Sequence, residues 1–182
     1  TDGETVFRHG PAMRLTYDDT QRSLLQRALS EAVGLTDRTA RPGVLAQVEI
    51  EITRWHNDAI QGYLQENGLK ATDIDVVGFH GQTVVHRPDI GITVQLGLGR
   101  ELAHQCRIPV VYDMRANDMI HGGQGAPLVP AYHRTLASKS KQHPIAIVNI
   151  GGVANVTWIG ADGDLVAFDT GPGNALIDDW IM

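Results

Sequence analysis

The sequence predicts an α/β protein whose first part alternates helices with strands and whose second part begins as an antiparallel sheet. Apolar residues recur at helical spacing over 20–33 and 44–67, and short apolar runs of strand length follow. After residue 144 the pattern changes to apolar runs separated by glycine turns, which is typical of a β-meander.

Two helices are expected before the first strand. The first begins within the polar run 18–20, whose residue types cap helix N-termini, and ends before Gly34. The second begins at about Val44 and ends at Gly68. Both carry an apolar stripe that we interpret as core packing. The stripe of the first helix consists of Leu24, Leu25, Ala28, Leu29, Ala32 and Val33.

The rest of the first part should contain strands and shorter helices. Strands are expected over 74–79, 93–96 and 109–112, and a short helix over 101–106. The segment 114–124 is polar and rich in glycine, so we expect a loop. A helix should begin near Ala126, because Pro127 is tolerated in a first helical turn.

The polar stretch 138–144 is interpreted as a domain boundary between residues 1–140 and 144–182. Beyond it, two apolar runs around Gly151-Gly152 predict a β-hairpin over 145–159.

The run 168–174 is the most informative part of the sequence. A strand over 165–168 should lead into Asp169, then a Gly-Pro-Gly turn, then a helix from Ala175. A carboxylate at a strand end lies where open α/β folds bind ligands. The alternative is that Asp169 caps a helix or closes a turn.

Composition disfavours several classes of protein. The 182 residues are 42% hydrophobic, which suffices for a packed core, and the net charge of −6 comes without a basic stripe for nucleic acid. No run of about 18 apolar residues is present. The single Cys106 cannot form an internal disulfide, which fits a reducing compartment. We therefore expect a cytoplasmic protein that binds neither nucleic acid nor membrane.

Both ends of the chain suggest a piece of a larger protein. The chain opens on the strand-like run 5–8 and stops at Met182 within an apolar helical pattern. A complete small domain with frayed ends is the alternative. A fragment should expose apolar surface around 145–158 and 176–181.

Polar clusters stand at the ends of the expected strands and in glycine turns, where side chains and backbone N–H groups can bind sugar hydroxyls or phosphates. Besides Asp169, they are His80-Gly81-Gln82-Thr83, Asp113-Met114-Arg115 with Asp118, Gly122-Gly123-Gln124-Gly125, and the run from Asn149 to Asn155.

Other sites are disfavoured. The sequence has no Walker phosphate loop, and Gly97-x-Gly99 lacks the third glycine of the dinucleotide fingerprint. His80 and His86 do not have the spacing of zinc ligands, so we predict no metal-binding residue. We expect Cys106 to be a buried, inert thiol.

These clusters, in their order and spacing, resemble the family of anhydro-N-acetylmuramic acid kinases. The resemblance covers nearly the whole chain. It rests on Gly78–Pro88 (G-x-H-G-Q-T-x-x-H-x-P), Thr93–Gly97, Asp113–Asp118, Gly122–Pro130, Asn149–Asn155 and Phe168–Asn174.

The resemblance implies a fold, an activity and its co-reactants. The family has an actin-like ATPase fold of two RNase H-like domains around a cleft. Its members open the 1,6-anhydro ring of anhydro-N-acetylmuramic acid with water and phosphorylate O6 with ATP and Mg²⁺, in cell-wall recycling. A homodimer is expected for the full-length protein.

The resemblance also assigns residues. Asp169 corresponds to the general base that activates the attacking water. The residues expected at the ATP phosphates are Asn149, Gly151, Gly152, Gly171 and Gly173. Those expected at the sugar are His80, Gln82, Thr83, Arg115, Asp118 and Gln124.

The sequence departs from the family in two respects, which leave alternatives open. The G-T-S-x-D-G phosphate turn that begins the family pattern is not in this sequence, nor is most of the second domain, so we expect the piece to be inactive alone. A non-catalytic, actin-like sugar-binding or regulatory protein is one alternative. A glycoside hydrolase is another, in which Asp113 or Asp118 would supply the second carboxylate.

Overall fold

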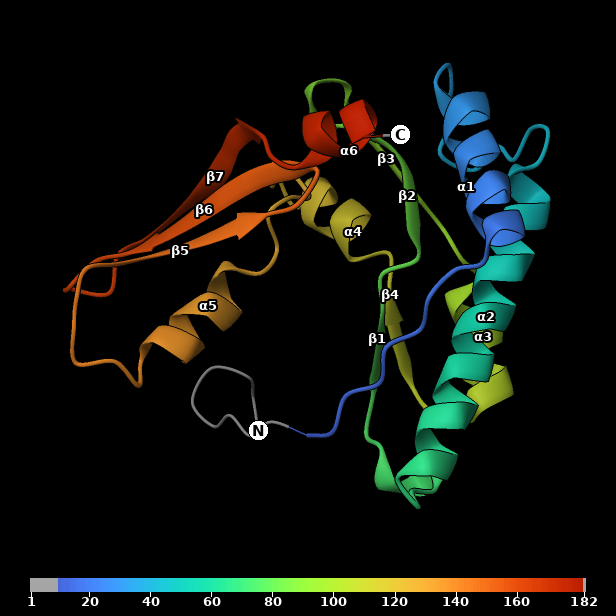
Figure 1. Ribbon diagram of the computed structural model, residues 1–182, viewed down its shortest axis with the longest axis horizontal. Helices are drawn as coiled ribbons and strands as arrows, with labels where there is room; N and C mark the ends of the chain where they lie inside the picture. Colours follow the sequence, from blue (N-terminus) through green and yellow to red (C-terminus); the bar gives the residue numbers. More distant parts are fainter. Residues whose placement is uncertain (1–9, 182) are drawn as a thin grey trace. The chain divides into compact units, whose positions relative to one another are not determined.

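The structure is a computed structural model that describes residues 10–181 (Figure 1). The expected strand over 5–8 lies outside the described residues. Pro11–Gly125 forms one compact unit, which we call the helical unit. The described residues from Ala126 onward belong to a second unit, which we call the sheet unit.

The helical unit contains two pairs of strands and four α-helices. Strands β1 and β4 pair in parallel, whereas β2 and β3 pair antiparallel. In chain order the elements are α1 (Asp19–Ala32), α2 (Leu45–Glu66), the 3-10 turn η1 (Ala71–Asp73), β1 (Val77–Phe79), β2 (Gln82–Arg87), the 3-10 turn η2 (Pro88–Ile90), β3 (Ile92–Leu96), α3 (Gly99–Cys106), β4 (Val110–Tyr112) and α4 (Met114–Ile120).

The start of α1 follows from its capping residues. The Asp18 side chain accepts a hydrogen bond from the Gln21 backbone N–H at 2.7 Å, and the Gln21 side chain accepts one from the Asp18 N–H at 2.9 Å. This reciprocal capping box fixes the first turn and confirms the predicted helix start.

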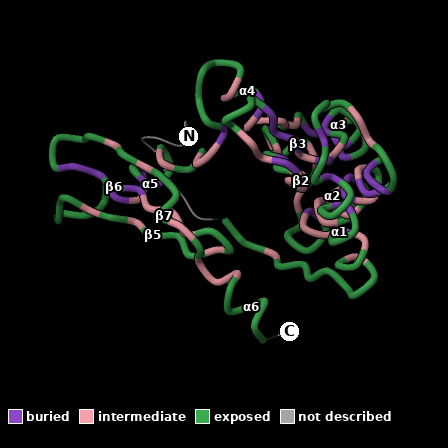
Figure 2. The backbone as a smooth tube through the Cα atoms, turned by 90° about the horizontal axis from the view of Figure 1, so that it is seen from above, coloured by how far each residue is buried: buried purple, intermediate pink, exposed green. Residues whose placement is uncertain are grey.

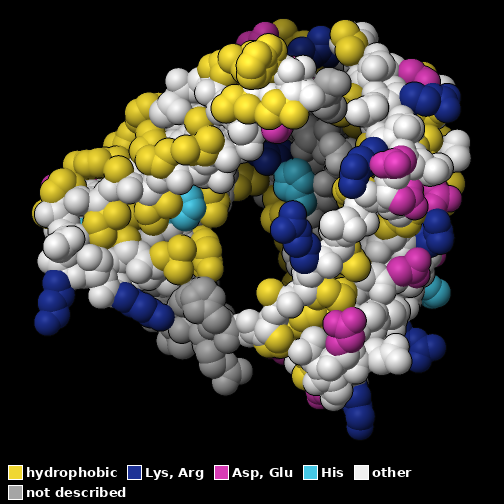
Figure 3. Space-filling view, in the orientation of Figure 1, with side chains coloured by type: hydrophobic (Ala, Val, Ile, Leu, Met, Phe, Trp, Pro, Cys, Tyr) yellow, Lys and Arg dark blue, Asp and Glu magenta, His cyan; other side chains and the backbone are white. Residues whose placement is uncertain are grey.

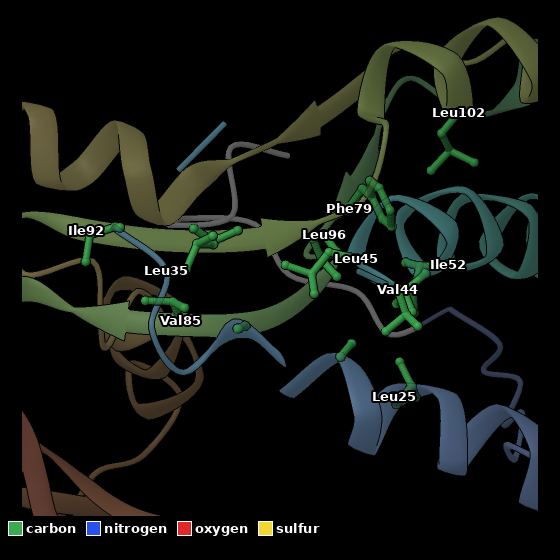
Figure 4. Packing of buried hydrophobic residues seen from close by; sticks show 14 residues of the cluster. Leu25, Leu35, Val44, Leu45, Ile52, Phe79, Val85, Ile92, Leu96 and Leu102 are labelled. Atoms are coloured by element: carbon green, nitrogen blue, oxygen red, sulfur yellow. The ribbon is translucent and has the colours of Figure 1, made fainter. Parts of the chain in front are cut away.

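The helical unit has a large hydrophobic core and a smaller hydrophobic cluster, which consists of Leu64, Cys106 and Ile108. Buried side chains from α1, α2, α3 and strands β1 to β3 meet in the large core (Figure 4), among them Leu25, Leu45, Ile52, Phe79, Leu96 and Leu102. Figure 2 marks the buried residues in purple along the backbone. The predicted stripe of α1 is broader than the observed one, because Leu29 and Val33 are exposed.

One expectation for the helical unit is wrong, and one strand, β2, lies where the sequence predicts none. The segment 114–124 is not a loop throughout, because Met114–Ile120 forms helix α4, which buries Ala116. Strand β2 was not predicted, because its side chains are mostly half-buried and show no alternation of apolar and polar residues.

The sheet unit consists of α5 (Pro130–Ala137), β5 (Ile145–Ile150), β6 (Val153–Ile159), β7 (Leu165–Pro172) and α6 (Ala175–Ile181). Its strands form an antiparallel sheet in the order β5-β6-β7, so the predicted hairpin is confirmed. β7 continues through Asp169 to Pro172, so the expected turn begins later than predicted.

Helix α5 begins at Pro130, so the expected start near Ala126 is wrong. A helix from Ala126 would place Pro130 beyond its first turn, where the proline ring clashes with the preceding turn and removes a hydrogen bond. With Pro130 in the first turn, neither cost arises.

The two faces of the three-stranded sheet differ. Helix α5 packs on the face that carries Thr157, and the His133 ring nitrogen Nδ1 lies 2.8 Å from Thr157 Oγ1. The opposite face is apolar and exposed, which confirms the expected exposed surface (Figure 3). Its exposed members are Val148, Ile150, Trp158, Val166 and Phe168.

The structure confirms an α/β protein. The boundary between 140 and 144 remains a prediction, and α5 lies in the same compact unit as β5–β7. None of the helices within residues 10–181 combines the length and the apolar composition that a membrane span requires.

Candidate functional site

The parallel pairing of β1 and β4 brings two predicted polar clusters to one edge. His80 follows β1 directly and Asp113 follows β4 directly, and the carboxyl ends of parallel strands share an edge. A cleft of about 290 Å³ opens there, which we call the strand-end cleft. Its lining includes Arg38, Arg41, Glu49, His80, Gly81, Gln95, Tyr112 and Asp113.

His80 is held in one tautomer by two neighbours. Arg115 Nε donates to His80 Nε2 at 3.1 Å, and a guanidinium can only donate, so Nε2 carries the lone pair. His80 Nδ1 lies 2.8 Å from the Gly81 carbonyl oxygen and therefore carries the proton.

Arg115 and Asp118, one helical turn apart on α4, hold a single residue of the glycine loop. Arg115 Nη1 donates to the Gly125 carbonyl at 2.7 Å, and Asp118 Oδ2 accepts from the Gly125 N–H at 2.8 Å. The side chains of His80, Arg115 and Asp118 thus form a continuous polar chain with the 122–125 loop. Gln124 itself is exposed.

The side chains of Gln82 and Thr83 do not lie on the same face of the β2–β3 sheet. They are consecutive residues of β2, so their side chains leave opposite faces. Gln82 Nε2 donates to the Thr83 carbonyl at 3.1 Å, whereas Thr83 Oγ1 accepts from Gln95 Nε2 at 3.3 Å.

Two arginines of the strand-end cleft were missed by the sequence analysis. Arg38 forms an ion pair with Asp113, whose backbone adopts a left-handed conformation at φ 57°. Arg41 binds Glu49 through two hydrogen bonds, at 3.0 and 2.9 Å. Both arginines come from the loop before α2. Arg38 and Asp113 are 75 residues apart in sequence, so no local pattern predicts their contact, whereas Arg41 and Glu49 are eight residues apart.

In the sheet unit, three polar residues lie side by side across the strands. Asn149 of β5 is in register with Asn155 of β6, and Asn155 is in register with Asp169 of β7. Register partners in antiparallel strands project from the same face. We call these three residues the polar row. They share the face of Thr157, which lies two positions after Asn155 along β6.

The two predicted glycine turns are joined by hydrogen bonds. Gly173 N–H donates to the Gly152 carbonyl and Asn174 N–H to the Gly151 carbonyl, each at 2.8 Å. A Cβ on Gly173 would overlap the Gly151 carbonyl, so only glycine allows this approach. Gly171, in β7, lies next to the same junction.

At this junction the backbone N–H of Gly152 is a hydrogen-bond donor that points away from the second glycine turn. The peptide between Gly151 and Gly152 is trans, so its N–H points opposite to its C=O. Since that carbonyl is directed at Asn174, the Gly152 N–H points away from the second turn, where an anion can accept it.

The residues from 10 to 181 contain no group of three or more His, Cys, Asp or Glu side chains that could hold a metal ion.

Comparison with known proteins places these observations in a family. The family model for anhydro-N-acetylmuramic acid kinase matches residues 22–182. The chain is 55% identical to the anhydro-N-acetylmuramic acid kinase of Rhizobium etli over 183 aligned positions, which cover the whole chain and 50% of that protein. The corresponding kinase of Methylobacterium nodulans is 57% identical, with 51% of it covered.

The kinase of Agrobacterium fabrum is 52% identical, again over the whole chain and 49% of the relative. The chain thus spans about half the length of the curated relatives it matches. Since the family model covers most of the sequence, the chain belongs to the anhydro-N-acetylmuramic acid kinase family.

Proposed function

We propose that the protein containing this chain is an ATP-dependent kinase that opens 1,6-anhydro-N-acetylmuramic acid with water and phosphorylates O6. Family membership supports the activity. The observation that carries the assignment of residues is the position of Asp169, in the polar row and next to the paired glycine turns.

Asp169 is proposed as the general base. Its carboxylate would take a proton from water as the water oxygen bonds to the anomeric carbon. The bond from that carbon to O6 breaks with its electron pair on O6. O6 then accepts the γ-phosphoryl group of ATP, and ADP leaves. Support comes from the exposure of Asp169 at the edge of the sheet unit.

The paired glycine turns are proposed to contact the ATP phosphates. The outward Gly152 N–H supports this role, because backbone N–H groups of glycine turns bind phosphate oxygens. Gly151, Gly171 and Gly173 would shape the junction, and Asn149 would add a side-chain donor. Mg²⁺ is proposed to be held mainly by the phosphates.

The sugar is proposed to contact the helical unit. His80, Gln82, Thr83, Arg115, Asp118 and Gln124 are the residues that the family resemblance assigns to it. His80 at the strand-end cleft is the best supported, because its ring is fixed by Arg115 and Gly81. Arg115 and Asp118 already bind Gly125, so we assign them to shaping the 122–125 loop as well.

The finer structural proposals rest on the family resemblance. They are an actin-like fold of two RNase H-like domains, a homodimer and a cytoplasmic location. The parallel β1–β4 pair and the β5–β7 meander are compatible with that fold.

The test uses the protein encoded by the complete reading frame. Incubation with ATP and the anhydro sugar should yield N-acetylmuramic acid 6-phosphate by mass spectrometry, and no product from a folded protein would refute the activity. Asp169→Asn should abolish turnover with little change in ATP affinity. Asp164→Asn, on an exposed carboxylate in the turn before β7, is the matched control.

The same assay separates the alternatives. An Asp169→Asn enzyme that stays within about tenfold of wild type would refute the base assignment. A sugar-binding or regulatory protein would bind the sugar without phosphorylating it. A glycoside hydrolase would open the ring without ATP.

A further inference from the structure

Asn155, between Asn149 and Asp169 in the polar row, has an unsatisfied side chain. Its amide oxygen Oδ1 is buried and receives no hydrogen bond from any residue that the structure describes. A buried acceptor without a partner costs free energy, so such a group calls for an explanation at the site where it occurs.

The neighbours of Asn155 have complementary chemistry. Asn149 and Asp169 are its register partners on the two adjacent strands, and directly opposed residues have Cβ atoms about 4.5–5.5 Å apart. An ionised carboxylate only accepts hydrogen bonds, whereas a side-chain amide both donates and accepts. When the Asn155 amide rotates, its oxygen can therefore accept a hydrogen bond from the Asn149 side-chain amide, and its NH2 group can donate one to the Asp169 carboxylate.

The backbone next to Asp169 is specialised. Asn155 pairs with Asp169 but Ala154 pairs with Gly171, so Thr170 is an extra residue, a β-bulge. Thr170 Oγ1 donates to the Ala154 carbonyl at 3.1 Å and pins the bulge. Bulges often re-aim a neighbouring side chain beside active sites.

We propose that Asn155 is a positioning residue, whose side-chain amide donates a hydrogen bond to the Asp169 carboxylate and accepts one from Asn149. This inference rests on the proposed function, in which Asp169 is the general base. The amide orients the carboxylate toward the attacking water and links it to the strand that leads into the glycine turns. Asn155 acts through Asp169 and touches no reacting atom.

The experiment compares three variants of the complete protein. Asn155→Ala removes the donor, and Asn155→Asp keeps the shape but places a second carboxylate beside Asp169. Asn57→Ala is the matched control, because Asn57 in α2 also has a buried, unsatisfied Oδ1 but lies outside the sheet unit. For each we would measure kcat, KM for both substrates and the thermal unfolding midpoint.

Asn155→Ala should lower kcat at least about tenfold, because a misdirected base loses its near-attack geometry, with KM values within about threefold of wild type. Asn155→Asp should lower kcat further, since two adjacent carboxylates repel. The unfolding midpoint of Asn155→Ala should fall about as far as that of Asn57→Ala, because each substitution removes a side-chain amide whose oxygen is buried.

Other outcomes decide against the inference. A kcat of Asn155→Ala within about threefold of wild type would overturn the proposal. So would a loss of kcat that is fully accounted for by a lower fraction of folded protein, as judged from the thermal unfolding midpoint. If Asn155→Ala does not fold, the near-isosteric Asn155→Asp carries the test, and full activity of that variant overturns the proposal. A wild-type protein without activity would instead refute the proposed function, which keeps the two failures distinct.

Discussion

The Asp118 carboxylate accepts a hydrogen bond from the backbone N–H of Gly125 at 2.8 Å. The Gly125 carbonyl accepts from Arg115, so both polar groups of one buried residue are satisfied by α4. A buried N–H that loses its partner costs about 1–3 kcal/mol. The conformation of the glycine loop therefore depends on two side chains of a seven-residue helix.

Asp118→Ala should release this loop. Without the carboxylate, the Gly125 N–H has no acceptor, and its hydrogen exchange should become about tenfold faster or more. Asp118→Asn keeps an oxygen acceptor and should change the exchange rate less. Exchange followed by mass spectrometry over 121–126 measures the effect. Equal rates in wild type and the alanine variant would show that the bond does not hold the loop.

Gly99→Ala should disturb the strand-end cleft. A Cβ at Gly99, the first residue of α3, would overlap the root of the Tyr112 ring, and Tyr112 lines the cleft. Overpacking of this kind costs about 1–3 kcal/mol. Gly34→Ala is the control, because nothing lies within 4 Å of its Cβ. Urea denaturation of both variants should show destabilisation only for Gly99→Ala, and equal stabilities would contradict the steric argument.

Thr39 lowers the pKa of Asp37 in the loop before α2. The Thr39 hydroxyl, then its N–H, donate to Asp37 Oδ1, at 2.7 and 2.8 Å, and these bonds favour the charged carboxylate. A pKa below the ordinary 3.8 contributes stability that is present above pH 3.8 and is lost as the pH falls through the folded pKa.

Thr39→Val removes the larger of these two effects. The pKa of Asp37 should rise toward its ordinary value, as measured by NMR titration of the side-chain carboxyl carbon. Thr39→Ser retains the hydroxyl and should titrate like wild type. An unchanged pKa in the valine variant would assign the lowering to the backbone N–H instead.

Local signals explain which elements could be predicted from the sequence. The start of α1 has its own capping residues, and the β5–β6 hairpin is marked by two apolar runs around glycines. Helix α4 is only seven residues long and buries one alanine, so it lacks the apolar stripe by which a longer helix is predicted. The short parallel pair β1–β4 depends on a contact between segments more than 30 residues apart, and only its two strands were predicted.

The polar row depends on the register of β5 against β6, because a shift of one residue would separate its members. If Gly151-Gly152 formed a two-residue turn, Ile150 would pair with Val153 and Asn149 with Ala154. The observed pairs are Ile150 with Ala154 and Asn149 with Asn155. A shift of one residue changes the face on which every partner lies, so the sequence alone could not predict that Asn155 lies between Asn149 and Asp169.

Arg41→Leu should destabilise the helical unit more than the loss of an exposed ion pair would. The side chains of Arg41 and Glu49 are 22% and 12% exposed, and Glu49 also lies 3.3 Å from the Gly97 N–H as its acceptor. Removing Arg41 leaves a largely buried carboxylate without its main partner, which should cost about 2–3 kcal/mol. Arg41→Lys keeps the charge but cannot form the pair of hydrogen bonds to Glu49, so it should lose only part of this free energy of unfolding.

The matched control for this prediction is Arg54→Leu on α2, whose pair with Glu51 is 59% and 29% exposed. Exposed pairs contribute about 0–1 kcal/mol, because water screens the charges and the long side chains lose entropy when they pair. Urea denaturation should therefore rank Arg41→Leu as least stable, Arg41→Lys next and Arg54→Leu close to wild type. Equal losses for the two leucine variants would show that burial of the Arg41–Glu49 pair does not matter for stability.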